Sequence, residues 1–229
     1  MRAAADAALF SIMSDATDGP EDAYIDPTGV DEAPHIILEL AASAFRMVKQ
    51  TLKIDLDFTP DTLPLLDHHL QAARAEAAKS PELRQLLATS AGGYFGEVVR
   101  RHLPFARWHV DETDAAETGA GWRIEFGHVY LHFNPIGAAH EVLIGADASG
   151  WQAHLEVLPA DRSLLEQALS RMGEIAEDDY YTLSVRFEVL AQVVAALEAA
   201  QVARGEVGRR FPRDIYRATA GEEPIGPAS

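Results

Sequence analysis

A carboxylate beside three glycines is the group in this sequence whose spacing is most suggestive of chemistry. Gly92, Gly93 and Gly96 precede Glu97, and Arg100 follows it by one helical turn. A glycine inside a helix costs about 0.5–1 kcal/mol relative to alanine, so some contact must offset all three. One alternative is that another segment packs closely on the glycines while Glu97 pairs with arginines of its own helix. The second is that bare backbone forms the floor of a pocket that contains Glu97, and the third is a break into two helices at Gly92 and Gly93.

The second alternative predicts a small-ligand-binding protein or an enzyme. Its pocket lies between the glycine-bearing helix and the following strands, with Glu97, Arg100 and His109 as candidate ligand-binding residues. No residue is assigned as catalytic, because the sequence lacks the G-x-S-x-G nucleophile elbow and the G-x-x-x-x-G-K-[ST] phosphate loop. The absence of cysteine excludes thiol catalysis, disulfides and cysteine-ligated metals.

Histidine, with nine copies, is the best-supplied reactive residue. His68 and His69 follow Asp67 in a predicted helix, where adjacent side chains diverge by about 100° and do not share an ion. His128 and His132 share one strand face but lie about 13 Å apart, which is too far for a common metal. We therefore predict no metal and no cofactor. One arrangement stays open, in which histidines converge across strands: His109, His132, His140 and His154.

The net charge of −17 limits the classes of partner. A chain this acidic is repelled by phosphate backbones and anionic lipids, so we expect neither nucleic-acid nor membrane binding. No uncharged apolar run is long enough to span a bilayer, and no secretory signal is recognisable, which favours the cytoplasm. A basic protein partner is compatible with this charge, and a homo-oligomer is left open.

Apolar spacing and capping residues predict the order of the elements. Three helices come first, at 34–52, 60–79 and 81–103. Four strand candidates follow, with a short helix at 136–144 between the third and the fourth: 107–111, 122–126, 128–133 and 150–158. Two further helices are expected at 161–172 and 178–204.

This order predicts an α+β fold. It consists of three N-terminal helices, a small, mainly antiparallel sheet of about four strands, and two C-terminal helices packed on the sheet. Residues 1–30 are rich in acids and helix breakers and should be loosely ordered, and residues 31–204 should form a single domain. Residues 205–229 should form a flexible tail that either folds back onto the acidic body or binds something acidic. The tail carries four arginines: Arg209, Arg210, Arg213 and Arg217.

Two stretches resemble a family of uncharacterised bacterial domains. The first, Leu56 to Asp67, is an extended lead into a capped helix; the second, Gly93 to Arg101, is followed by Trp108. The second stretch is similar to the family's G-x-Y-x-G-E helix with a tryptophan strand after it. The resemblance covers residues 55–135 and implies a bacterial α+β domain, and it transfers no active site.

Taken together, these features predict a non-catalytic protein-interaction domain, of the immunity or accessory type, with an acidic surface. The pocket around Glu97 is the alternative, and a purely structural subunit of a homo-oligomer is a third. What distinguishes them is the surroundings of Glu97: arginine pairing under close helix packing indicates an architectural role, whereas a concave opening indicates ligand binding.

Overall fold

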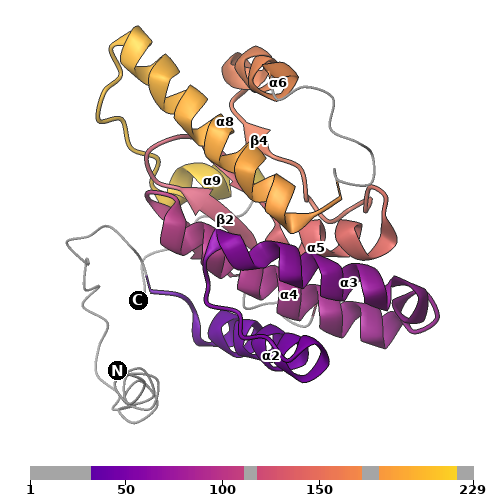
Figure 1. Ribbon diagram of the computed structural model, residues 1–229. Helices are drawn as coiled ribbons and strands as arrows, with labels where there is room; N and C mark the ends of the chain where they lie inside the picture. Colours follow the sequence, from indigo (N-terminus) through magenta and orange to yellow (C-terminus); the bar gives the residue numbers. More distant parts are fainter. Residues whose placement is uncertain (1–31, 111–117, 172–180, 221–229) are drawn as a thin grey trace, which may run out of the picture.

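The computed structural model describes residues 32–110, 118–171 and 181–220 (Figure 1). These residues form seven α-helices and a four-stranded antiparallel sheet, which confirms the predicted α+β class. The helices are α2 (His35–Leu52), α3 (Leu63–Ala77), α4 (Pro81–His102), α5 (Pro135–Ile144), α6 (Arg162–Arg171), α8 (Leu183–Arg204) and α9 (Arg213–Ala220). Short 3₁₀ turns, Pro60–Thr62 and Pro159–Asp161, precede α3 and α6.

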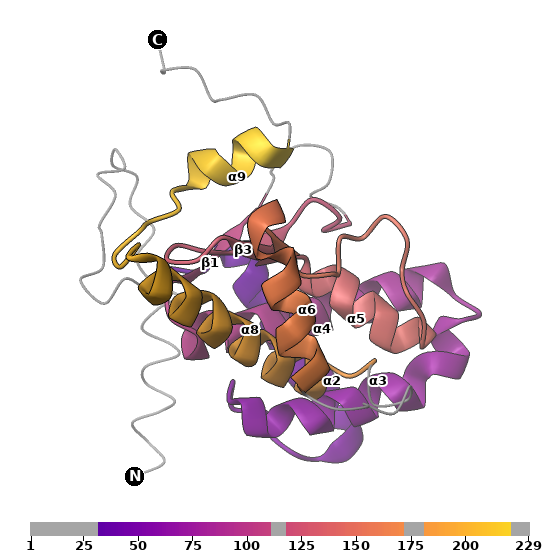
Figure 2. The same cartoon turned by 90° about the horizontal axis from the view of Figure 1, so that it is seen from above.

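The sheet is a simple meander in the order β1-β2-β3-β4. Its strands are β1 (Ala106–His109), β2 (Arg123–Phe126), β3 (Leu131–Phe133) and β4 (Glu156–Val157). Trp108 of β1 pairs with Ile124 of β2, and Glu125 pairs with His132 of β3. Figure 2 shows the sheet between two layers, with α4 and α2 on one side and α9 on the other.

Helix α4 lies at the centre of the fold and begins as its sequence predicts. The Ser80 side chain accepts a hydrogen bond from the backbone N–H of Leu83 at 3.1 Å, and Pro81 takes the first helical position. Every residue from Leu87 to Val99 is buried except Thr89, so the helix is enclosed on nearly all sides. Such enclosure requires a neighbour on each face of the helix.

The three glycines of α4 each receive a different neighbour. A Cβ atom at Gly92 would lie 2.5 Å from the Cα of Ile136 in α5, and one at Gly96 would lie 2.0 Å from the Trp108 ring of β1. At Gly93 the same atom would lie 2.9 Å from the nearest side-chain atom of α2. Contacts this close are incompatible with any larger side chain, so the glycines are required by packing.

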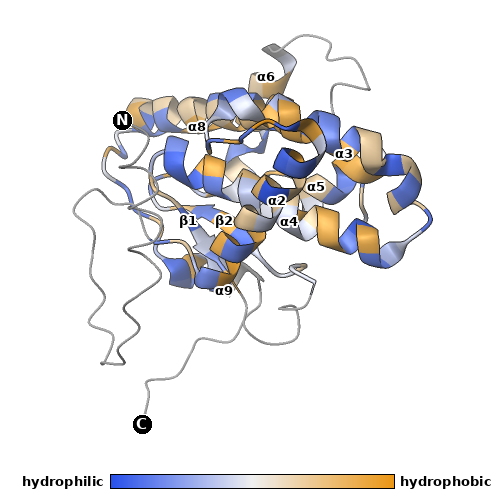
Figure 3. Cartoon of the chain, turned by 60° about the horizontal axis from the view of Figure 1, so that its bottom comes forward, coloured by the Kyte–Doolittle hydropathy of each residue, from blue (hydrophilic) through white to orange (hydrophobic). Residues whose placement is uncertain are grey.

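Helices α2, α3 and α8 each combine one buried face with one polar face. Figure 3 shows apolar and polar residues interleaved along α2, α3 and α8, as expected for helices at the surface of a core. In the part of the chain that the structure describes, no helix is both long and apolar enough to cross a membrane.

Two details of the sheet differ from the sequence-based expectation. Only Glu156 and Val157 of the expected strand 150–158 pair with β3. Upstream, the chain lies against the start of α5, where the Trp151 carbonyl oxygen would be 2.6 Å from a Cβ on Gly137. The strands expected at 122–126 and 128–133 leave Gly127 alone between them, but the connection has four residues, because Phe126 would be the next residue to face Leu131.

The C-terminal helices also differ from the expectation. Helix α8 packs mainly against α3 and α6, and its buried residues recur at the three- and four-residue spacing of one helix face. The outer face of the sheet is covered by α9, from the segment that we expected to be a flexible tail. Phe211 and Tyr216 of that segment are buried. Residues 1–31 and 221–229 lie outside the described residues, and the expected division into domains stays a prediction.

Replacement Gly96→Ala tests the packing of α4. Alanine favours an isolated helix by about 1 kcal/mol, but its methyl group would overlap the Trp108 ring. We expect the overlap to dominate and to lower the free energy of unfolding by about 1–3 kcal/mol. Urea denaturation measures the change.

The matched control is Ser90→Ala in the same helix. The Ser90 hydroxyl is buried without a hydrogen-bond partner, so its removal should leave stability unchanged or slightly higher. If Gly96→Ala stabilised the protein, the proposed close contact with Trp108 would not exist.

Candidate functional site

Glu97 is fully buried and accepts four hydrogen bonds from its own chain. Arg100 donates from Nε to Oε1 at 2.8 Å and from Nη2 to Oε2 at 3.0 Å. Arg101 donates from Nε to Oε2 at 3.2 Å, and the indole N–H of Trp108 donates to Oε1 at 3.0 Å. The carboxylate therefore has two cations and one neutral donor as partners, which together compensate its loss of hydration.

The glycine at position 96 makes this arrangement possible. Because Gly96 has no side chain, the Trp108 ring lies directly against the α4 backbone and its N–H reaches the neighbouring Glu97. The sequence alternative in which Glu97 pairs within its own helix describes this geometry. A ligand at Glu97 would have to displace an arginine or the tryptophan, and ligand binding there stays an untested prediction.

The structure brings two of the three candidate ligand-binding residues together. Glu97 and Arg100 are in direct contact, whereas His109 occupies the strand position after Trp108 and therefore faces the opposite side of the sheet. There His109 Nδ1 lies 3.9 Å from an oxygen of Glu125. The spacing along the chain could not reveal this, because it depends on which residue of β1 faces α4.

Glu125 forms a second buried carboxylate cluster, on the outer face of the sheet. Arg123 donates to its Oε1 at 3.0 Å, and Arg107 approaches its Oε2 at 3.4 Å. Although Glu125 is a charged residue in a strand where apolar and charged residues alternate, it is fully buried. Segment 205–220 covers this face, and no local sequence signal indicates that cover.

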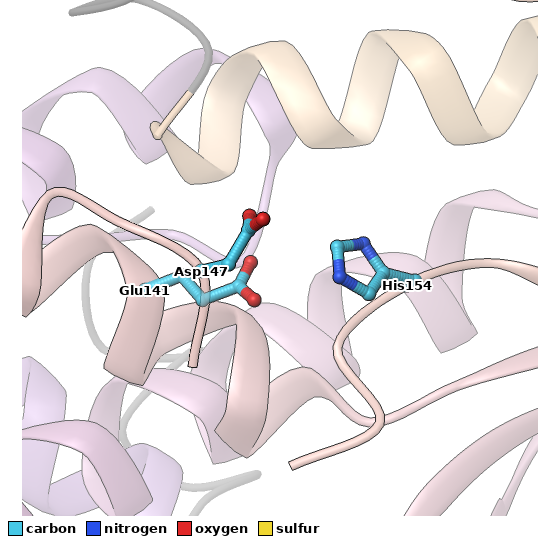
Figure 4. A group of neighbouring side chains, drawn as sticks. All are labelled: Glu141, Asp147 and His154. Carbon is cyan, nitrogen blue, oxygen red and sulfur yellow. The ribbon is translucent and has the colours of Figure 1, made fainter. Parts of the chain in front are cut away.

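Glu141 of α5 forms a third cluster. Its carboxylate pairs with Arg186 of α8 and accepts the backbone N–H of Ala148 at 3.0 Å. Figure 4 shows Asp147 and His154 converging on it, and the ligand atoms of the three side chains lie within 4.8 Å of one another. A single acid in segment 136–144, whose one other polar side chain is that of His140, is the sequence signal that could have identified Glu141 as buried.

Glutamate, aspartate and histidine side chains could together hold a divalent ion such as zinc or manganese. In this structure, however, the guanidinium group of Arg186 already neutralises Glu141, and Asp147 and His154 are exposed. A metal ion would have to displace Arg186 from a fully buried partner. The geometry therefore gives no reason to replace the prediction that the chain holds no metal.

In the Asp67-His68-His69 sequence, the aspartate has a structural role. The two carboxylate oxygens of Asp67 accept the backbone N–H groups of Leu183 at 2.6 Å and Ser184 at 3.0 Å, which caps α8. Burial raises the pKa of Asp67 although these hydrogen bonds oppose the shift. The aspartate thus joins α3 to α8, and His68 is exposed to solvent.

His140 of α5 is a buried histidine with no hydrogen-bond partner for Nε2. Its ring packs on Trp151 with centroids 4.0 Å apart. Burial, with a smaller contribution from the positive charge of Arg84, lowers the pKa of His140 to about 4. The histidine is therefore neutral in the folded protein near neutral pH.

No protein-family model, curated protein or solved structure matches this chain. The resemblance of residues 55–135 to a family of uncharacterised bacterial domains stays a prediction.

The variant Glu97→Gln tests the structural role of the buried carboxylate. It leaves Arg100 and Arg101 without their anion, and breaking a buried ion pair costs about 3–5 kcal/mol. We expect a loss of this size in the free energy of unfolding, measured in urea, while exposed Glu166→Gln should change it by less than about 0.5 kcal/mol. Unchanged stability in Glu97→Gln would favour the ligand-binding alternative.

The low pKa of His140 predicts a specific pH dependence. The unfolded chain takes up this proton near pH 6.5 and the folded protein only near pH 4, so stability falls as the pH is lowered through this window. Because one pKa unit corresponds to about 1.4 kcal/mol, His140 alone should lower the free energy of unfolding by up to about 3 kcal/mol across this window.

The comparison that isolates this contribution uses His140→Gln, which cannot titrate. Its free energy of unfolding should fall less than that of the wild type between pH 7 and pH 4, whereas His35→Gln, at an exposed histidine, should follow the wild type. Parallel curves for the wild type and His140→Gln would contradict the assignment.

Proposed function

We propose that this protein is a non-catalytic interaction protein, of the immunity or accessory type, whose acidic surface binds a basic protein partner. The proposal includes a bacterial, cytoplasmic setting, as expected from the sequence. It is supported by the ion pairs that the arginines form in the structure.

Six of the sixteen arginines are ion-paired with only four buried carboxylates. These acids are Glu97, Glu125, Glu141 and Asp161. Removing these ten residues from the balance leaves thirteen cations against thirty-two acids, a charge of −19 for the rest of the chain. Arg101 and Arg204 stay exposed, while the other four arginines pair with three fully buried glutamates. The excess of acids therefore lies outside these buried ion pairs, which is the single observation that carries the proposal.

Exposed acids are distributed over several helices. Glu39 lies on α2, Glu166 on α6 and Glu188 on α8, and all three are exposed. Exposed charges of this kind contribute little to stability, typically below about 1 kcal/mol. They do accelerate encounter with an oppositely charged protein and exclude partners of like charge.

The buried carboxylates support a non-catalytic role. Each of the three fully buried glutamates already has an arginine partner, so none has the free access to a substrate that acid–base catalysis requires. The same negative charge repels phosphate backbones, which favours a protein over a nucleic acid as the partner.

The test is affinity capture with the full-length protein, followed by a binding assay with the purified partner. We expect a partner of high isoelectric point whose affinity falls at least tenfold between about 0.05 and 0.5 M salt, where the Debye length becomes short. Glu39→Lys, Glu166→Lys and Glu188→Lys, made singly, should locate the contacting face by weakened binding.

Arg46→Glu on the exposed surface of α2 is the matched control, because it adds negative charge and should not weaken binding. A complex that survives high salt unchanged, or a partner without excess positive charge, would contradict the proposal.

A further inference from the structure

The C-terminal segment of this acidic protein is basic and lies on the outer face of the sheet. Residues 209–217 contain four arginines and one aspartate, a local charge of +3 in a chain of −17. Figure 2 shows that α9 lies on the side of the sheet opposite to α4. The molecule therefore contains a short basic segment, residues 209–217, that ends in α9 and is bound to its own surface.

Most of the polar contacts of this segment are made to backbone groups of the sheet. The Tyr216 hydroxyl lies 2.7 Å from the carbonyl oxygen of Phe126 and 3.0 Å from that of Val129, and accepts the N–H of Leu131 at 3.2 Å. Arg213 donates to the carbonyl oxygen of Trp108 at 2.7 Å. The face thus presents carbonyl acceptors to a hydroxyl and a guanidinium group spaced three residues apart on one helix.

The segment is also joined to the turn after β2. The N–H of Phe211 donates to the Gly127 carbonyl oxygen at 2.8 Å, and Arg107 donates to the Phe211 carbonyl oxygen at 2.7 Å. These bonds set the position of the chain just before α9 begins. They require only backbone atoms of the bound segment, so another peptide could make them.

The apolar contacts form a cluster separate from the main core. Tyr216 stacks on Tyr130 with ring centroids 4.7 Å apart and planes 8° from parallel, and Phe211 meets the edge of Tyr130 at 5.8 Å. These three side chains are buried, and Leu158 packs beside them. Because the cluster does not merge with the core, loss of α9 need not disrupt the rest of the fold.

The connection between α8 and α9 is exposed. Val207 is 75% exposed, and the backbone of Gly208 has a positive φ of 84°. Arg209 and Arg210 are exposed as well, and Arg210 lies over the Phe105 ring at 4.8 Å. The segment is thus attached through residues with few buried contacts, as expected of a part that exchanges with a competitor.

We infer that this face of the sheet is a binding site for a basic helix of a partner protein, and that α9 occupies it in the isolated chain. The partner helix would carry arginine and tyrosine three residues apart, with an aromatic residue five positions before the tyrosine, as Phe211, Arg213 and Tyr216 do. This inference rests on the proposed function, because it specifies how the basic partner binds.

The chemistry of the face selects this class of ligand. The backbone carbonyl oxygens of Trp108, Phe126 and Val129 accept hydrogen bonds, so they favour a ligand that carries hydroxyl and guanidinium donors. The stacked Tyr130 ring favours an aromatic side chain, and the overall negative charge favours a basic one.

The test uses a fluorescein-labelled peptide with the sequence of residues 207–220 and the full-length protein. Tyr216→Ala in the protein weakens the attachment of α9, so the peptide should bind this variant at least tenfold more tightly than the wild type in fluorescence anisotropy. Arg213→Ala in the protein gives a second route to the same result if Tyr216→Ala fails to fold. A peptide carrying Tyr216→Phe and Arg213→Ala together should bind at least tenfold more weakly than the wild-type peptide.

Equal or absent binding of the peptide to the wild type and both variants would overturn the inference. It would also be overturned if the wild type exchanged α9 between two copies, seen as a concentration-dependent dimer that the peptide does not dissociate. The proposed function has a separate test. If the captured partner binds with an affinity that does not depend on salt, the proposed function is contradicted even when the peptide binds. If the partner's affinity depends on salt but the peptide does not bind, only this inference is contradicted.

Discussion

The close approach of three segments to helix α4 is the constraint on which the rest of the structure depends. Gly92 admits α5, Gly93 admits α2, and Gly96 admits the Trp108 ring of β1. The helix propensity lost at the three positions, about 2–3 kcal/mol in total, is offset by burial of α4 on nearly every side. The position of Glu97 follows from the same contact, because Trp108 reaches its carboxylate only across Gly96.

Buried charge is the second organising feature. Glu97 joins α4 to β1, Glu125 stabilises the outer face of the sheet, and Glu141 joins α5 to α8. Such pairs contribute modest net stability but are costly to break, so they favour one arrangement of elements over others. They also keep four arginines at least partly buried: Arg100, Arg107, Arg123 and Arg186. Both proposals about partners start from the excess of acids in the rest of the chain and from the basic C-terminal segment.

The α+β class, and the order and most bounds of the helices before α9, could be predicted because they depend on local spacing and caps, as with Ser80 and Pro81 at the start of α4. Helix α9 was not predicted. The pairing of Glu97 with arginines of its own helix was one of three alternatives, and the sequence could not place Trp108 against Gly96. His109 could not be separated from Glu97 by sequence, since one residue decides which face of a strand a side chain occupies. The burial of Glu125 depends on α9, about 90 residues away along the chain, and no local pattern encodes it.

Native-state hydrogen exchange of the α4 backbone amides tests the central claim most directly. If close packing at the glycines holds the fold together, the amides of residues 92–97 should exchange only through global unfolding, with a free energy equal to that measured in urea. Exchange of these amides at a clearly lower free energy, while those of α2 and α5 stay protected, would show that α4 opens locally at the glycines. That result would contradict an architectural role for them and support a ligand-binding role for Glu97.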